Sequence, residues 1–292
     1  MIDNEIVINE AYMNQLEFYF GTSADLMDFS NAQEAADKVN NFVNFTTDGL
    51  INSIVKSSSF SEATKMVLVN AIYFKANWKY PFDEKLTGFM NFRTNPDKYF
   101  RFRHGMKMNT DQLSYAKYNI KDLKAEILAL PYADENFRML LILPETHIED
   151  LNLDKLNFNS LDVNLQKKKI DLTLPKFKID FSQSLVDPLE RMNVSSIFHS
   201  ANFKHIAPHE GLKVTDIFHR AMVEVSEEGS EAAAATAVQL DIRRGDGYNS
   251  PIVLNFDKPF YFIIQDMKHK IPLFMGRIVD PSGLRKLETK IN

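Results

Sequence analysis

The 292-residue chain carries 39 acidic and 34 basic residues, for a net charge of -5 at pH 7, and 45% of its residues are hydrophobic. This balance allows a sizeable core and gives no reason to expect nucleic acid as a partner. No cysteine is present, which excludes disulfides and metal–thiolate sites. No apolar run approaches the roughly 20 residues that span a bilayer, so no membrane is expected as a partner either.

The first part of the chain predicts two helices with a short strand between them. Residues 9–20 place Tyr12, Leu16 and Phe20 at near-helical spacing, and residues 23–29 favour a short strand.

A second helix follows, for which Ser30 with Gln33 resembles a capping box. The residues that this helix is expected to bury are Ala35, Ala36, Val39, Phe42 and Val43. Asp48-Gly49 ends it, and residues 64–78 then favour a long buried strand.

The rest of the chain predicts mostly strands. Residues 125–132 and 137–144 favour a hairpin. Short helices fit residues 147–165, and the helix SLVDPLERM spans 184–192. The other predicted strands are 87–93, 99–118, 169–181, 214–225, 252–256, 260–266 and 272–279. Because strands and helices are mixed and no linker separates them, the sequence predicts a single α+β domain over residues 1–292.

An alanine-rich tether joins the strand that ends at Val225 to the strand that begins near Pro251. Alanine is a strong helix former, so the tether could be a short surface helix, or else a flexible linker. Read as an extended segment, it places small side chains on one face, as Ser230, Ala232 and Ala234 show. Such a face could slide between the strands of an existing sheet without overpacking it.

Residues 227–238 (EEGSEAAAATAV) resemble the hinge of an inhibitory serpin. Further motifs of that family occur in order: LVNAIYFKANW at 68–78, LPY at 130–132, LPKFKID at 174–180, HRAMVEV at 219–225, KPFYFII at 258–264 and PLFMGRIVDP at 272–281. The resemblance therefore covers most of the chain, to residue 281.

This resemblance implies the serpin fold, with a large mixed central β-sheet, a second β-sheet layer, covering helices and an exposed reactive-centre loop. Residues 21–49 look like the strand and helix that cover the main sheet. Residues 63–78 and 212–228 look like its two central strands, and residues 252–279 like the closing strands of the second sheet. Complete members begin with several more helices, so we expect this chain to lack the amino-terminal part of the fold.

The resemblance also implies the residues that act. The hinge would comprise Glu227, Glu228, Gly229, Ser230, Glu231, Ala232, Ala233, Ala234, Ala235 and Thr236, within a hinge and loop segment at 227–251. The loop spacing of the family, counted from Gly229, places the scissile bond at Arg243–Arg244. An exposed arginine fits the acidic specificity pocket of trypsin-like proteases. Both arginines could instead be solvated loop charges, and Arg244 stays open as the specificity residue.

The mechanism that the resemblance implies is a conformational trap. The protease serine forms an acyl-enzyme at Arg243, and the cleaved loop 229–242 then inserts into the central sheet. Asn70 and His219 match a polar pair that links the two central strands until the loop enters. Trp78 matches a tryptophan at the point where the hinge enters, although it could equally be ordinary core.

Signals of an enzyme are missing: the sequence contains no GxSxG, GxxxxGK[ST] or HExxH motif. His205 and His209 have metal-pair spacing, but Pro208 argues against a helix there. We therefore expect no catalytic residues, no metal and no cofactor. Arg244-Gly245-Asp246 spells RGD, which on its own is weak support for integrin binding.

The expected function is suicide inhibition of a trypsin-like serine protease by a monomer, with a cysteine protease as an open alternative target. A non-inhibitory serpin-like protein or an inactive fragment, acting as a protease substrate, carrier or chaperone, is the competing hypothesis, and a hydrolase or other enzyme is the third. The amino end lacks the features of a secretory signal. Two glycosylation triplets, at Asn44 and Asn193, agree with secretion, so an extracellular location is the expectation.

Overall fold

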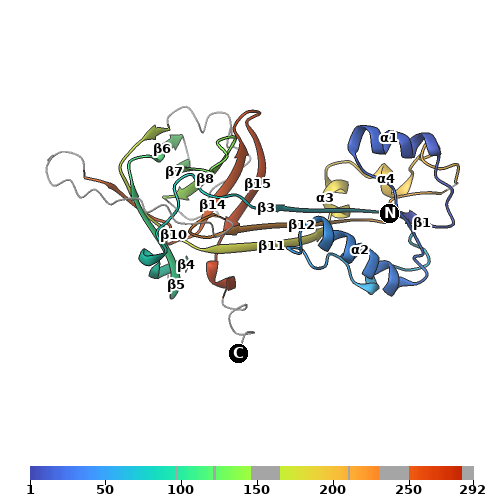
Figure 1. Cartoon of the computed structure of the whole chain (residues 1–292), viewed down its shortest axis with the longest axis horizontal. Helices are drawn as coiled ribbons and strands as arrows, with labels where there is room; N and C mark the ends of the chain where they lie inside the picture. Colours follow the sequence, from blue (N-terminus) through green and yellow to red (C-terminus); the bar gives the residue numbers. More distant parts are fainter. Residues whose placement is uncertain (96–97, 121–122, 146–164, 210, 230–249, 285–292) are drawn as a thin grey trace. The chain divides into compact units, whose positions relative to one another are not determined.

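The computed structural model describes residues 1–95, 98–120, 123–145, 165–209, 211–229 and 250–284 (Figure 1). The chain divides into two compact units, Met1–Phe74 with Ile179–Val223 and Lys75–Lys178 with Glu224–Asn292. Each unit contains helical segments and strands, in agreement with the predicted α+β class. The single-domain organisation stays a prediction.

The first unit begins with the predicted helix, strand and helix. Strand β1 (Ile2–Asp3) pairs in parallel with β2 (Leu26–Met27). Helix α1 (Glu10–Phe20) lies between them in the chain, and the side chain of Asn9 caps its first turn. This part of the prediction is confirmed.

Helix α2 (Ala32–Thr46) differs from the prediction in two details. Its cap is Asn31, whose Oδ1 accepts from the backbone N–H of Glu34 at 3.3 Å, so the predicted Ser30–Gln33 capping box lies one residue too early. Phe42 was expected in the core, but its side chain is 46% exposed. The buried side of α2 consists of Ala35, Ala36, Val39 and Val43.

A three-stranded sheet extends through the first unit in the order β11-β12-β3 (Figure 1). Strands β3 (Val67–Phe74) and β12 (Asp216–Val225) pair in parallel over eight positions, from Asp216 opposite Val67 to Val223 opposite Phe74. Strand β11 (Phe177–Ser184) forms the other edge and leads to the short helices α3 (Val186–Arg191) and α4 (Ser196–His199). Helix α2 packs on one face of this sheet, against Val67, Val69 and Ala71.

The strand predicted over 64–78 is shorter and less buried than expected. It ends at Phe74, and Leu68 and Asn70 are exposed. Both lie on the face of β3 opposite to α2, because side chains alternate along a strand.

The second unit contains two sheets. The smaller has the order β13-β10-β5-β4 and consists of β4 (Gly88–Asn95), β5 (Lys98–Thr110), β10 (Ile170–Pro175) and β13 (Ile252–Asn255). The larger has the order β15-β14-β8-β7-β6-β9. Its strands are β6 (Ser114–Ile120), β7 (Leu123–Pro131), β8 (Phe137–Pro144), β9 (Gln166–Lys167), β14 (Phe260–Asp266) and β15 (Ile271–Ile278).

The predicted hairpin of residues 125–132 and 137–144 is confirmed as β7 and β8, which pair antiparallel. The strand predicted over 169–181 is instead two strands, because β10 and β11 join different sheets on either side of Lys176. Most of the short helices predicted at 147–165 lie outside the described residues. Within the described ranges, no helix is long and apolar enough to cross a bilayer.

Candidate functional site

A tight turn at Ser226–Gly229 begins where β12 ends. The N–H of Ser226 donates to the carbonyl of Gly229 at 3.2 Å, and the N–H of Gly229 donates back to the carbonyl of Ser226 at 3.3 Å. The Ser226 hydroxyl also donates to the Gly229 carbonyl, at 2.6 Å. This hinge turn (residues 226–229) is thus a defined structure and no continuation of the strand.

Most of the predicted hinge and loop lies beyond this turn. Residues 230–249 are outside the described part of the chain. The predicted site residues among them are Ser230, Glu231, Ala232, Ala233, Ala234, Ala235, Thr236, Arg243 and Arg244. Glu227, Glu228 and Gly229 can be placed, and their surroundings define the site.

Only glycine fits at position 229. Its φ of +109° is unfavourable for a residue with a side chain. A Cβ there would lie 2.2 Å from the carbonyl oxygen of Ala76 and 2.6 Å from Cα of Asn77. Both are backbone atoms, so neither can move aside as a flexible side chain would.

Trp78, which was predicted at the end of the strand over 64–78, lies beyond the end of β3 and contacts the hinge turn. Its indole Nε1–H donates to the carbonyl of Ser226 and its backbone N–H to the carbonyl of Glu228, both at 2.9 Å. The indole stacks on the ring of Tyr132 with centroids 4.5 Å apart. Burial raises the pKa of Tyr132, which therefore stays neutral. Trp78 is thus a buried core residue that also donates two hydrogen bonds to the hinge turn.

Glu227 is the buried anchor of the turn, with a residue exposure of 3%. Its carboxylate accepts from the Thr87 hydroxyl at 2.6 Å and pairs with Lys176 Nζ at 2.6 Å. Its backbone carbonyl accepts from the N–H of Phe82 at 2.8 Å. Burial by itself would raise the pKa of Glu227, but the hydrogen bonds from Lys176 and Thr87 outweigh it and lower the pKa below its usual value.

The sequence reasoning named Glu227 but missed its two partners. Lys176 is part of the LPKFKID motif at 174–180, and only the motif as a whole was used. Thr87 gave no signal, because a threonine at the start of a predicted strand is common. Glu228 differs from Glu227: its Oε2 is buried and has no hydrogen-bond partner among the described residues.

Asn70 and His219 are brought opposite each other on β3 and β12, as predicted. No hydrogen bond joins them, however, and Nδ1 of His219 is buried without a partner in the described part of the chain. A polar link at this place comes from Arg220, which donates to Asp180 on β11 at 2.7 Å and also to the carbonyl of Ser53. Arg220 thus links β12 to β11 and not to β3, so the described contacts between β3 and β12 at this point are those of their backbone pairing.

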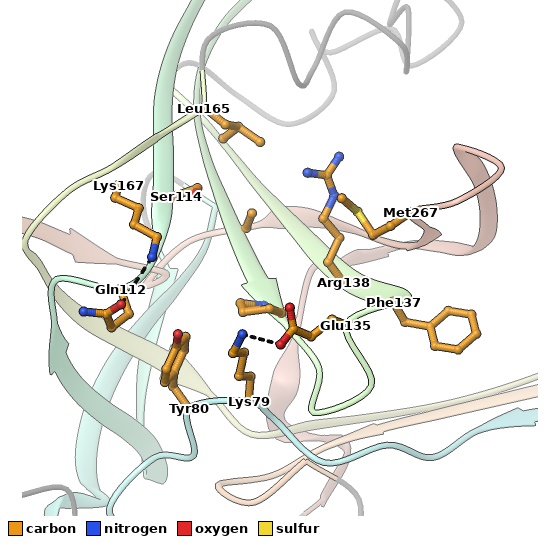
Figure 2. A pocket seen from close by; sticks show the side chains of 12 residues that line it. Lys79, Tyr80, Gln112, Ser114, Glu135, Phe137, Arg138, Leu165, Lys167 and Met267 are labelled. Carbon is orange, nitrogen blue, oxygen red and sulfur yellow. Dashed lines mark hydrogen bonds and ion pairs between the residues drawn. The ribbon is translucent and has the colours of Figure 1, made fainter.

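A pocket of about 510 Å³ is lined in part by Lys79 and Tyr80, the two residues that follow Trp78 (Figure 2). Lys79 and Glu135 form an ion pair across it at 2.6 Å, and Lys167 donates to Gln112 at 3.3 Å. Ser114 is its one hydroxyl of a type used as a nucleophile by hydrolases, and no histidine is among the described residues that line it. The described residues also contain no group of three or more side chains able to hold a metal.

Comparison with known proteins gives consistent matches. The family model for Serpin (serine protease inhibitor) matches residues 1–281. Mouse macrophage plasminogen activator inhibitor 2 is 35% identical over 93% of this chain and 67% of its own length. Antitrypsin of Bombyx mori is 33% identical over 84% of this chain and 63% of its own length.

Solved structures agree. Serpin48 of the insect Tenebrio molitor superposes with a TM-score of 0.82 at 28% identity, over 96% of this chain and 73% of that one. Human thyroxine-binding globulin gives a TM-score of 0.84 at 26% identity, over 96% and 73%. A family match over nearly the whole chain, with the hinge turn and its anchors in place, leads to one conclusion: the chain belongs to the serpin family.

Proposed function

We propose that the chain is a suicide inhibitor of a trypsin-like serine protease, with Arg243 as the residue offered to the protease. The observation that carries this proposal is the hinge turn. The chain segments that follow β3 and β12 meet there, through Trp78 and Glu228, directly before the alanine-rich segment. That segment therefore starts where these two paired strands end.

The covalent chemistry takes place at the bond between Arg243 and Arg244. The protease serine attacks the carbonyl carbon of Arg243, the peptide bond to Arg244 breaks, and the new amino group of Arg244 leaves. The chain is then held as an ester on the protease. Residues 229–242, freed at one end, insert as a strand between β3 and β12, with their small side chains inward. Insertion displaces the bound protease before water can cleave the ester.

The relatives support the type of target. One is named a plasminogen activator inhibitor and another an antitrypsin. A basic residue at the predicted bond is consistent with targets that cleave after arginine. Action outside the cell is part of the proposal, and it is consistent with the exposed Asn193 of the second glycosylation triplet.

Incubation with trypsin tests the proposal. A band that resists denaturing electrophoresis, with the mass of chain plus protease, is the expected result. Arg243→Ala should abolish this band, whereas Arg244→Ala should leave it; the reverse pattern would make Arg244 the specificity residue. Cleavage after Arg243 without a covalent band would instead identify a substrate, as expected for the non-inhibitory alternative. No cleavage in the loop at all would contradict both.

A further inference from the structure

An exposed basic face lies on β4 and β5. Arg101 and Arg103 are exposed on β5, and Phe102 between them is buried. Arg93 on β4 lies opposite Tyr99, and the guanidinium of Arg101 is 4.5 Å from the centre of the Phe89 ring. We call Phe89, Arg93, Tyr99, Arg101 and Arg103 the basic face.

The positive charge of this face is not balanced by its own strands. Neither β4 nor β5 contains an aspartate or a glutamate, although the chain as a whole has a net charge of -5. Arg93 and Arg103 form no ion pair with any described residue. Lys98 and Lys107 add two further exposed cations to β5. A concentration of cations against the overall charge attracts an acidic partner.

The composition of the face favours a protein over a flexible polyanion. Arginine, tyrosine and phenylalanine are enriched in the centres of protein interfaces and among their hot spots. Phe89 is 56% exposed and Tyr99 is 72% exposed, so two aromatic rings are available for contact. The antiparallel pairing of β4 and β5 also fixes the backbone positions that carry these side chains before binding, which reduces the entropy lost on association.

The sheet that carries the basic face also contacts the chain at both ends of the proposed reactive-centre loop. On the hinge side, Glu227 is anchored by Thr87, which directly precedes β4, and by Lys176, whose N–H donates to the His104 carbonyl of β5 at 2.8 Å. On the other side the chain returns at β13, in the same sheet. A protein bound to the loop is therefore kept near this sheet, where a second contact acts at a high effective concentration.

We propose that the basic face is a docking surface for an acidic region of the protease that attacks the loop. The inference rests on the proposed function, since it takes the protease as the partner. Attraction between the opposite charges would raise the rate of encounter and select among proteases that share a preference for arginine.

Anionic and cationic trypsins provide the probes, because both cleave after arginine and they differ in surface charge. Docking is measured with forms whose catalytic serine is replaced by alanine, so that trapping does not contribute. At low ionic strength we expect the 292-residue chain to bind the anionic form about tenfold more tightly or better, and 0.5 M salt to reduce this preference. The double variant Arg93→Glu/Arg103→Glu should lose it.

Arg191→Glu is the matched control, because Arg191 is an exposed arginine outside the basic face. It should keep the preference for the anionic form. An equal loss in both variants would overturn the proposal, and so would a preference that survives the double reversal. If the double variant loses binding of dextran sulfate but keeps the trypsin preference, the face binds a polyanion and the proposal is wrong.

The active trypsins separate this inference from the proposed function. If the docking preference depends on the basic face but no covalent band forms with active enzyme, the trapping mechanism fails and the docking surface stands. If a covalent band forms at equal rates with both trypsins, and the double variant changes neither rate, the inhibitor stands and the docking surface fails.

Discussion

Glu227 shows how a single side chain fixes the hinge. Burying a carboxylate is unfavourable unless its charge is paired and its oxygens accept hydrogen bonds. Glu227 meets both conditions, with Thr87 on Oε1 and Lys176 on Oε2. Removal of one partner would leave the other charge poorly compensated, so the pair stabilises the turn as long as both members are present and ionised.

Stability should therefore depend on pH through Glu227. The pKa of Glu227 is lowered in the folded chain, so its contribution is fully present above its unfolded value of 4.5 and is lost as the pH falls through the lower folded value. Relative to Glu227→Gln, which keeps an acceptor for Thr87, we expect wild type to be more stable by about 2 kcal/mol at pH 7. Urea unfolding at pH 7 to 3 measures this.

The advantage of wild type over Glu227→Gln should shrink below pH 4.5, and in a Lys176→Met background it should be lost or reversed at pH 7, because the buried carboxylate then has no cation beside it. A difference that stays constant down to pH 3 would show that the carboxylate charge is not what holds the turn.

Gly229 supports the turn sterically. We expect Gly229→Ala to lower the free energy of unfolding by about 1–3 kcal/mol, because the added Cβ meets backbone atoms of Ala76 and Asn77 in an already unfavourable φ. Gly211→Ala is the matched control: Gly211 also has a positive φ, +78°, but a Cβ there meets no atom within 4 Å. Similar losses in both variants in urea would mean that φ alone matters and that the close contact does not.

At the scale of elements, the proposal depends on which face of the inserting segment turns inward. In an extended chain, Ala232 shares a face with Ser230 and Ala234, whereas Ala233 shares the opposite face with Glu231. Ala232→Arg should thus place a charge in the sheet interior, slow insertion and convert most of the covalent complex into cleaved chain.

Ala233→Arg carries the same charge on the outer face and should keep the yield of complex near that of wild type. Denaturing electrophoresis after reaction with trypsin measures both yields. Equal yields from the two variants would contradict strand insertion in this register.

The elements also show what the sequence could predict. Two short apolar runs joined by a short polar turn predicted the hairpin of β7 and β8. The break at Lys176 was missed, since IDLTLP and FKIDFSQS look continuous in apolar character although they belong to different sheets. Local patterns do not record which sheet a strand joins.

The candidate site was predictable only in part, and for a related reason. Glu227, Gly229 and Trp78 stand in recognisable motifs and were named. Thr87 and Lys176 reach the site through the tertiary fold, and neither has a local feature that marks it as a partner of Glu227. The expected link between Asn70 and His219 is only a pairing of positions, because alignment of two strands does not guarantee that their side chains form a hydrogen bond.

For the whole molecule, the proposal requires that the uncleaved chain is not in its most stable arrangement. Strands β3 and β12 form backbone hydrogen bonds directly with each other. An inserted strand would have to break these bonds and form new ones with both strands. Insertion between them replaces one interface by two and adds a full set of ladder hydrogen bonds and buried side chains.

Cleavage at Arg243 should therefore stabilise the molecule. Thermal unfolding after limited proteolysis should show a Tm raised by about 10 °C or more, because each kcal/mol shifts the Tm of a chain of this size by about 2–4 °C. Cleaved Ala232→Arg should show a much smaller rise, since its loop is cut but cannot insert fully. If cleavage raises the Tm of wild type and of this variant equally, or if it lowers the Tm, the loop does not enter the sheet between β3 and β12. Its cleavage would then be proteolysis of an exposed loop without insertion.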